Sequence, residues 1–342
     1  MICVIRASLQ ANPTATLGQD FGRGLFSEML VTNLKAFMLV TVAAAALHAQ
    51  SPRLTGTPPR PEPGSIVKLT LDQIATRSDS VVAIRGTMAG EPLHFLPATS
   101  IAWHALGAVP VDASDSVVAM VFLERSSGSV DTVGMKLKVP HEPTPTSASG
   151  RGRGGAGSRL TVDRRFTRPL DSETEARVER ENERARDVGR RSHESGPMWT
   201  LPFIRPRMST ITSRFGSGRV FNGRLASRHL GVDFRGRVGE PVQATNRGVV
   251  VIVDNFFLAG NVVYIDHGAG VVTGYFHLSE QRVAVGDTVE RGQEIGVVGS
   301  TGRVTGPHLH WAARYGTVSV DPLDLTTLGD GWYAARTGSS RR

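Results

Sequence analysis

The chain has 342 residues, of which 40% are apolar and 20% charged, with 38 glycines and 19 prolines. This composition is that of a globular protein, and the many turn formers favour β structure over helix bundles. The only cysteine, Cys3, excludes disulfides within the chain and thiolate zinc sites. The net charge of +8 comes almost entirely from arginine. It favours a polyanionic partner such as nucleic acid, anionic lipid or an acidic envelope polymer, although an arginine-rich codon bias explains it equally well.

The start of the chain has the pattern of a secretory signal. Within 29–49, Lys35 precedes an apolar run over Ala36–Leu47, and a small residue closes the segment. This order predicts a signal peptide, and the run is too short to predict a stable membrane span. We expect translation to begin at Met29, so that residues 1–28 are not part of the protein. With no cysteine near the cleavage point a lipoprotein anchor is ruled out, and an uncleaved anchor is the alternative. Either way we expect export to the periplasm or the cell exterior.

The remaining chain alternates between linkers and β-rich regions. Short apolar runs with period-two patterning, spaced by turn residues, predict a small antiparallel β sandwich as an accessory domain. One strong helix is expected over 171–192, with Ser172 and Glu175 as a capping box and a charged, solvated surface. After it come short strands and many glycines, which predict an all-β domain. The expected organisation is a Pro-rich linker at 50–65, the accessory domain at 66–140, a linker plus the charged helix at 141–200, the C-terminal domain at 201–330 and a tail at 331–342.

Five of the ten histidines lie in the C-terminal domain, and their spacing suggests a metal site. In "HLHW", His308 and His310 are two apart on an expected strand, so both side chains share one face. "RHLGVDF" adds His229 and Asp233, which also share a side if the segment is extended. Two imidazoles and a carboxylate form a three-ligand set typical of catalytic zinc, with the fourth position open to water. "GYFHLS" adds His277, so two histidines remain beyond the needs of the metal.

Other histidines and neighbouring polar residues receive no role. The "HE" pairs at His141 and His193 lack a second histidine four residues on, so neither forms the helical HExxH zinc site. His94 and His104 are interpreted as ordinary strand or loop residues, since no carboxylate stands near them at ligand spacing. The remaining candidates are interpreted as core or turn residues: Tyr275 as core, Asp266 and His267 as a turn between strands.

The C-terminal motifs resemble those of a known family. "HLGVDF", "GNVVYIDHGAGVVTGYFHL", "VAVGDTVERGQEIGVVGSTGRVTGPHLHW" and "VDPLDL" are similar, in this order, to the lysostaphin-type (LytM-like) zinc metallopeptidases, which are cell-wall endopeptidases. The resemblance covers about residues 208–325 and implies a compact β hybrid or sandwich with zinc in an open groove. It implies that His229, Asp233 and His310 bind Zn²⁺ and that His308 and His277 are catalytic. We expect His308 as the base and His277 as the oxyanion stabiliser.

The expected function is therefore an exported zinc endopeptidase that hydrolyses peptide cross-links of peptidoglycan. The alternative is a non-catalytic LytM-like protein that binds the wall or activates an amidase, but the full ligand set argues against it. A lipoyl or biotinyl carrier is excluded because no lysine follows Lys138. Peptidoglycan is the expected partner, a nucleic acid is not, and any regulatory partner is unknown. The bond remains open between a D-alanyl–diaminopimelate cross-link and a glycine bridge.

Overall fold

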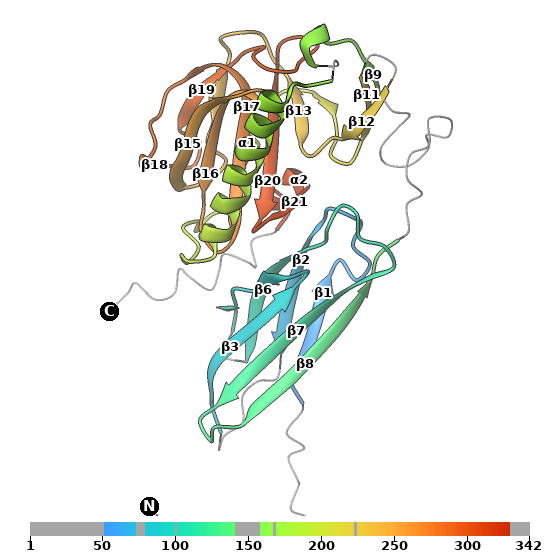
Figure 1. Ribbon diagram of the computed structural model, residues 1–342. Helices are drawn as coiled ribbons and strands as arrows, with labels where there is room; N and C mark the ends of the chain where they lie inside the picture. The colour runs from blue at the N-terminus through green and yellow to red at the C-terminus, as the bar shows by residue number, and fades with distance from the viewer. Residues whose placement is uncertain are drawn as a thin grey trace, which may run out of the picture. The chain divides into compact units, whose positions relative to one another are not determined.

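The computed structural model describes residues 51–72, 79–99, 101–140, 158–166, 169–221 and 224–328, and Ala49–Arg342 form one compact unit. The expected signal peptide, the segment before it, His141 and the C-terminal tail lie outside these residues. Throughout the described ranges, no helix has the length and apolar content needed to cross a membrane. The described chain is mostly β-strand, as expected, with two α-helices (Figure 1).

The accessory domain is the predicted antiparallel sandwich. Along β7, buried and more exposed side chains alternate, which places one face of the strand in a shared core. Leu69, Leu71, Met88, Val121 and Leu123 fill that core from both sheets. The first sheet has the order β1 (Arg53–Thr57), β2 (Ile66–Asp72), β6 (Ala102–Ala108), β5 (Leu96–Pro97), and the second β4 (Glu91–Pro92), β3 (Val81–Met88), β7 (Ser116–Arg125), β8 (Val130–Lys138).

Strand β1 corrects one expectation. Its residues fall inside the segment 50–65 that we expected to be a linker, yet they pair with β2 over their whole length. Leu54 is buried in the sandwich core, and Gly56 lets the side chains of Val67 and Leu137 approach its backbone closely. Four of the five prolines that suggested a linker follow this strand, so the composition of the segment concealed a strand of five residues.

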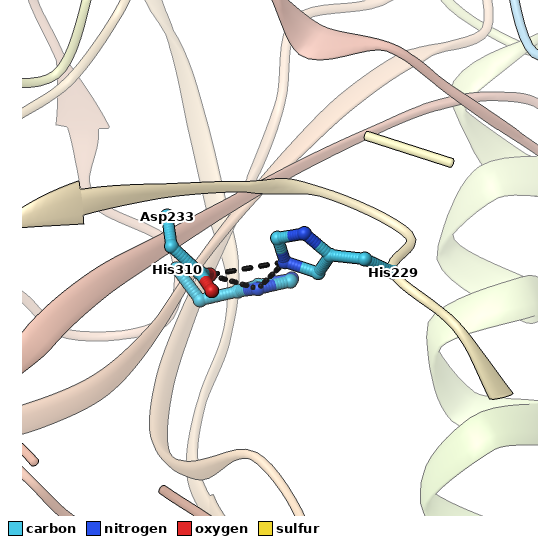
Figure 2. A group of neighbouring side chains, drawn as sticks. All are labelled: His229, Asp233 and His310. Atoms are coloured by element: carbon cyan, nitrogen blue, oxygen red, sulfur yellow. Dashed lines mark hydrogen bonds and ion pairs between the residues drawn. The ribbon is translucent and has the colours of Figure 1, made fainter. Parts of the chain in front are cut away.

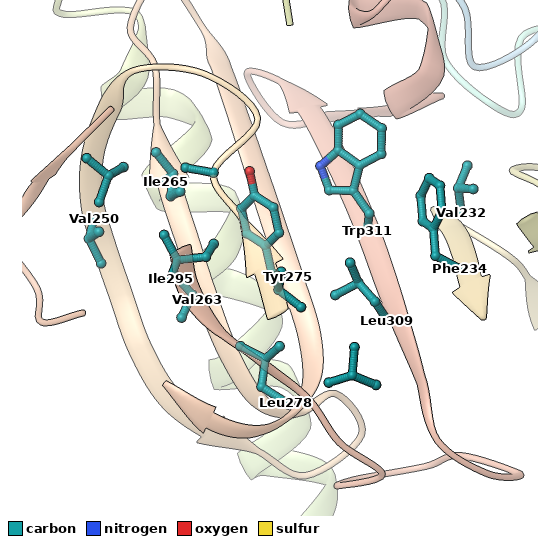
Figure 3. Close-up of a cluster of buried hydrophobic side chains, with 14 of the residues drawn as sticks. Val232, Phe234, Val250, Val263, Ile265, Tyr275, Leu278, Ile295, Leu309 and Trp311 are labelled. Atoms are coloured by element: carbon teal, nitrogen blue, oxygen red, sulfur yellow. The ribbon is translucent and has the colours of Figure 1, made fainter. Parts of the chain in front are cut away.

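The C-terminal domain is built on one large sheet. The central strands follow the order β10-β13-β20-β17-β16-β15-β18. In addition, β19 pairs with β17 and with β14, and β21 pairs with β20. Figure 3 shows Tyr275, Leu309 and Trp311 pointing into the buried cluster that these strands share. The bounds are β10 (Ile211–Ser213), β13 (Val232–Arg235), β14 (Pro241–Gln243), β15 (Gly248–Phe256), β16 (Gly260–Asp266), β17 (Val271–Gln281), β18 (Thr288–Val289), β19 (Glu294–Val298), β20 (His308–Tyr315) and β21 (Val318–Val320), with helix α2 (Pro322–Leu325) after them.

The charged helix forms as expected but is not solvated all round. Helix α1 spans Ser172–Ser192, and its N-cap is Asp171, one residue before the expected cap, because the Asp171 carboxylate accepts a hydrogen bond from the Thr174 amide. Its buried face, with Ala185, packs on β15, β16 and β17 (Figure 1). Arg184 forms an ion pair with Asp254 on β15. The helix therefore covers one face of the sheet.

A second, three-stranded sheet includes part of the expected linker. Strand β9 (Ser158–Leu160) pairs in parallel with β11 (Gly218–Phe221), which also pairs with β12 (Arg224–Arg228). A short 3₁₀ helix, η1 (Arg164–Phe166), follows β9. We expected residues 158–160 to be linker, and this expectation is wrong. They form a strand that extends the β11–β12 hairpin, although the two are about 60 residues apart in the sequence.

Hydrogen bonds join the accessory domain to the far end of β20. The Tyr315 hydroxyl donates to the Pro92 carbonyl at 2.7 Å, and the Thr317 amide donates to the Glu91 carboxylate at 2.8 Å. His193, which we placed in a linker without a role, lies 3.0 Å from the same carboxylate. A buried apolar cluster adds side chains from both domains, including Ile66, Leu106, Ala108, Trp199, Phe203, Tyr315 and Leu325.

His267 is a structural histidine, buried at the end of the large sheet. Its Nδ1 donates to the Arg247 carbonyl at 2.8 Å, and its Nε2 lies 2.8 Å from the Thr273 hydroxyl. Burial lowers the pKa of His267 to about 4, from 6.5.

We expect this burial to make stability depend on pH. As the pH falls from about 6.5 to about 4, the unfolded chain binds a proton at His267 before the folded protein does, so the free energy of unfolding decreases, by up to about 3 kcal/mol. Urea unfolding of the metal-free protein at pH 7.5 and 4.5 measures the slope. His267→Gln should reduce it. An equal slope in both proteins would show that His267 does not contribute.

Candidate metal centre

Two neighbouring strands bring the expected ligands together. Asp233 on β13 and His310 on β20 are direct partners across an antiparallel pair, which places both side chains on the same face. His229 lies just before β13, where Gly231 lets the chain turn tightly beside the His310 ring. Within β20, Leu309 points into the core, as the alternation of "HLHW" predicts (Figure 3). His229, Asp233 and His310 are all buried.

The donor atoms converge on one point. Nε2 of His229 lies 2.9 Å from Nδ1 of His310, and Oδ1 of Asp233 lies 3.0 Å and 2.9 Å from these two nitrogens (Figure 2). Tetrahedral zinc, with bonds of about 2.0–2.2 Å, sets its donor atoms about 3.3 Å apart. The three atoms therefore need to separate by only a few tenths of an ångström to hold such an ion.

The protonation of these groups also favours a cation. The Nδ1 of His229 lies 3.0 Å from the Arg214 carbonyl, which can only accept, so the ring proton is on Nδ1 and Nε2 has a lone pair. That lone pair and the Asp233 carboxylate face each other at 3.0 Å. Two acceptors this close repel each other unless a positive charge lies between them. The donor set therefore fits a metal ion, as its chemistry predicts.

Burial and charge keep these groups in the forms that bind metal. Burial lowers the pKa of His229, and lowers that of His310 to about 4, so both rings are neutral near pH 7. Burial alone would raise the pKa of Asp233, but its close polar contacts with the His229 and His310 rings outweigh burial and hold the pKa well below its ordinary value. Metal ligands must be neutral imidazoles and an ionised carboxylate, which is this combination.

His277 reaches the site through a β-bulge. Between β16 and β17 the register shifts, so that Phe276 and His277 lie opposite one residue. His277 has a φ of 61°, in the left-handed region that residues other than glycine seldom adopt. Phe276 stacks on the His310 ring, while the His277 ring lies 4.9 Å from that of His308. The bulge therefore turns two successive side chains toward the donor atoms.

One loop orients both of these histidines. Nδ1 of His277 lies 2.8 Å from the Thr301 carbonyl, and Nδ1 of His308 lies 2.8 Å from the Gly306 carbonyl. Because carbonyl oxygens only accept, Nδ1 donates in each ring and Nε2 has the lone pair. Nε2 of His308 is buried without a hydrogen-bond partner among the described residues and lies 3.7 Å from Oδ1 of Asp233.

The tautomers of His277 and His308 bear on the roles expected for them, which were oxyanion stabiliser and base respectively. Burial and the nearby His308 and His310 hold the pKa of His277 well below its ordinary value, so its ring is neutral. A neutral His277 with its proton on Nδ1 cannot donate from Nε2 to an oxyanion. Both histidines therefore present a proton acceptor to the site, a detail that "GYFHLS" and "HLHW" do not reveal.

Comparison with known proteins matches the residues that form this site. The model of peptidase family M23 matches residues 227–322, which contain all five expected site residues. Residues 227–322 are a peptidase family M23 domain. The resemblance to lysostaphin-type enzymes is thereby confirmed for the part of the chain that holds the site.

Curated relatives of the M23 domain have the word endopeptidase in their names. Peptidoglycan DD-endopeptidase ShyA of Vibrio cholerae is 52% identical over 102 residues, which are 30% of this chain and 24% of the relative. DD-carboxypeptidase/endopeptidase Mpg of Neisseria meningitidis is 44% identical over 97 residues, 28% of this chain and 22% of the relative. The chain thus spans about a quarter of the length of these curated relatives.

A solved structure shares the fold of most of the chain. It is a Pseudomonas aeruginosa protein provisionally assigned to peptidase M23, with a TM-score of 0.55, and it is 23% identical to this chain. The match covers 78% of this chain and 95% of that one, so it extends well beyond the M23 domain.

An arginine that was not predicted from the sequence holds the carboxylate ligand. Arg219 on β11 donates from its guanidinium to Oδ2 of Asp233, while Oδ1 faces the two imidazoles. A partner on the second oxygen fixes the orientation of a ligating carboxylate. No motif marks Arg219, since its place depends on how the β11–β12 hairpin folds over the site.

The residues that received no role lie away from the donor atoms. Tyr275 is fully buried, and its hydroxyl lies 2.9 Å from that of Thr245, so it belongs to the core as expected. Nε2 of His94 lies 2.8 Å from Nδ1 of His193, which makes both part of the contact between domains. His104 is on β6 of the accessory domain.

The lack of a side chain at Gly231 is expected to be important for metal affinity, because it leaves room for the His310 ring. A Cβ at this position would lie 2.5 Å from Nε2 of His310 and 2.6 Å from the Trp311 carbonyl. Gly231→Ala should therefore displace the His310 ring and weaken metal binding about 10- to 100-fold, as changes around metal ligands do. Chelator competition measures the affinity. Gly196→Ala is the control, because nothing lies within 4 Å of its added Cβ, and equal affinity in the two variants would contradict the argument.

Proposed function

We propose that this protein is an exported zinc endopeptidase that hydrolyses peptide cross-links of bacterial peptidoglycan. The observation on which this rests is the convergence of His229, Asp233 and His310 beside two histidines whose Nε2 lone pairs face the same space. The names of the wall endopeptidases that share the M23 domain support the substrate class. The apolar run over 29–49 supports export.

The proposed chemistry divides between the ion and the histidines. Zinc, held by the three ligands, would act as a Lewis acid that polarises a peptide carbonyl and lowers the pKa of a bound water to about 7. His308 accepts the proton that the attacking water loses, because its Nε2 is unprotonated and lies 3.7 Å from the Asp233 ligand. The resulting imidazolium then donates this proton to the leaving nitrogen.

His277 supports this cycle from the neighbouring position. Its neutral ring accepts a proton only when one is released close by, since burial and neighbouring rings lower its pKa. With a second proton, taken from solvent as negative charge develops on the carbonyl oxygen, its Nε2 would donate to the oxygen of the tetrahedral intermediate. The left-handed backbone at this residue is a further sign of a functional position, because strained residues concentrate at active sites.

The bond that we propose is the D-alanyl–diaminopimelate cross-link, which joins two D-centres, in keeping with the DD-endopeptidase names of the relatives. The non-catalytic alternative is not favoured, because wall-binding or amidase-activating domains have no use for a complete ligand set with two oriented histidines.

Digestion of purified cross-linked peptidoglycan by the full chain tests this function. Mass spectrometry of the soluble products should show cross-linked dimers converted to monomers, with the reaction blocked by a chelator and restored by zinc. Persistence of the dimers when zinc is bound would contradict the proposal.

A further inference from the structure

Arginines gather on both sides of the donor atoms. One hollow lies beside Asp233 and a second beside His229, and Arg219 and Arg303 line both. These two side chains therefore stand between the hollows, next to the ligands. Further arginines line one hollow each, namely Arg235 the first, and Arg228 and Arg314 the second.

Positively charged side chains greatly outnumber negatively charged ones in the lining of these two hollows. Among the described residues that line the two hollows, Asp233 is the only carboxylate, and it already contacts two imidazoles and Arg219. Arg219 and Arg303 both line the same two hollows, and burial, followed by the charge of Arg219, lowers the pKa of Arg303. Two partly buried cations that line the same hollows favour an anion between or beside them.

A carboxylate is the anion that a peptide substrate can supply. The planar guanidinium donates two parallel hydrogen bonds to a carboxylate, and such charge-assisted pairs are stronger than neutral ones. In a D-alanyl–diaminopimelate cross-link, the carbon bonded to the scissile nitrogen also bears a carboxylate. In a glycine bridge, the same carbon bears only hydrogens and the next peptide group. The two candidate bonds therefore differ in the group that Arg303 would recognise.

On the basis of the proposed function, we propose that Arg303, beside Arg219, binds a free carboxylate on the residue that follows the scissile bond. Arg219 contributes charge while it positions Asp233, and Arg303 is the residue that determines specificity. The substrate class is then a cross-link with a free diaminopimelate carboxylate, and glycine bridges or amidated cross-links are poor substrates.

Three synthetic cross-linked peptides test this assignment with the full-length, zinc-loaded protein. One has all carboxylates free, one has the diaminopimelate carboxylate beside the scissile bond converted to the amide, and one has the glutamate carboxylate of the stem converted to the amide. Amidation beside the bond should lower kcat/KM about 10- to 100-fold, the effect of losing a hydrogen bond between charged groups. Amidation of the glutamate should leave kcat/KM nearly unchanged.

Variants of Arg303 and Arg247 distinguish recognition of the carboxylate by Arg303 from general attraction of an anionic substrate by positive charge. Arg303→Gln should cleave the free and amidated peptides at similar rates, and Arg303→Lys should keep part of the preference. Arg247→Gln, which removes one exposed positive charge paired with Glu290, should keep the full preference. The zinc content of each variant shows whether its site is intact.

Equal cleavage of the free and amidated peptides by the wild type would overturn the subsite while leaving the endopeptidase in place. The assignment is also overturned by a preference that survives in Arg303→Gln, or by sensitivity to glutamate amidation alone. Failure to cleave any of the three peptides with zinc bound would remove the proposed function, and this subsite with it.

Discussion

His310→Ala is expected to lose both the metal and the activity. The ring supplies one of only three protein donor atoms, and its loss leaves His229 and the Asp233 carboxylate with too few partners to hold the ion. Zinc content should fall from about one per chain to near zero, and hydrolysis of cross-linked peptidoglycan to background. Elemental analysis after gel filtration measures the first, and release of muropeptides the second.

The control for His310→Ala removes a histidine from outside the site. His104→Ala changes a residue on β6 of the accessory domain and should keep both zinc and activity. A His310→Ala protein that retains zinc would mean that another side chain, with His308 the nearest candidate, is the third ligand. Thermal unfolding of both variants establishes that each one is folded.

His308→Ala is expected to keep the metal and lose the rate. The Nε2 lone pair of this ring lies 3.7 Å from the Asp233 carboxylate, but His308 does not belong to the group of three residues whose donor atoms converge, so the ligand set remains complete without it. Removing a general base typically lowers the rate by about 10²- to 10⁴-fold. We expect kcat to decrease in this range while KM changes little.

The comparison of the two variants decides the assignment within "HLHW". Equal loss of zinc in His308→Ala and His310→Ala would show that the roles are wrongly divided. Full activity in both would remove the site altogether. His277→Ala should resemble His308→Ala in zinc content, since Nε2 of His277 also lies outside the ligand set.

That the expected ligand residues lie close together could be predicted from the sequence, because their spacing reflects strand geometry. His308 and His310 share a face of β20, and Asp233 lies directly across from His310 on the next strand. Alternation of this kind is local and can be read directly from the residues. The sandwich core was predictable for the same reason, as β7 alternates regularly between buried and more exposed positions.

Features that depend on pairing between distant segments could not be predicted. The bulge that aims His277 arises from the register of β16 against β17, and the carbonyls of Thr301 and Gly306 that set the tautomers depend on the path of a loop. Strand β9 resembles linker sequence until it pairs with β11. Arg219 and Arg303 lack any local pattern, because their function arises only where the hairpin and the loop meet.

The contact between the accessory domain and the far end of β20 affects where this chain can be cut into separate fragments. The strand that begins with the two histidines ends at Tyr315, whose hydroxyl is bonded to the accessory domain at Pro92. The stretch that matches the family model, 227–322, contains neither helix α1 nor the apolar side chains of Ile66, Leu106 and Trp199 that cover this end. The portion that matches the family is therefore smaller than the portion that buries its own core. A fragment cut at the family boundaries would expose apolar surface on the strand that carries His308 and His310.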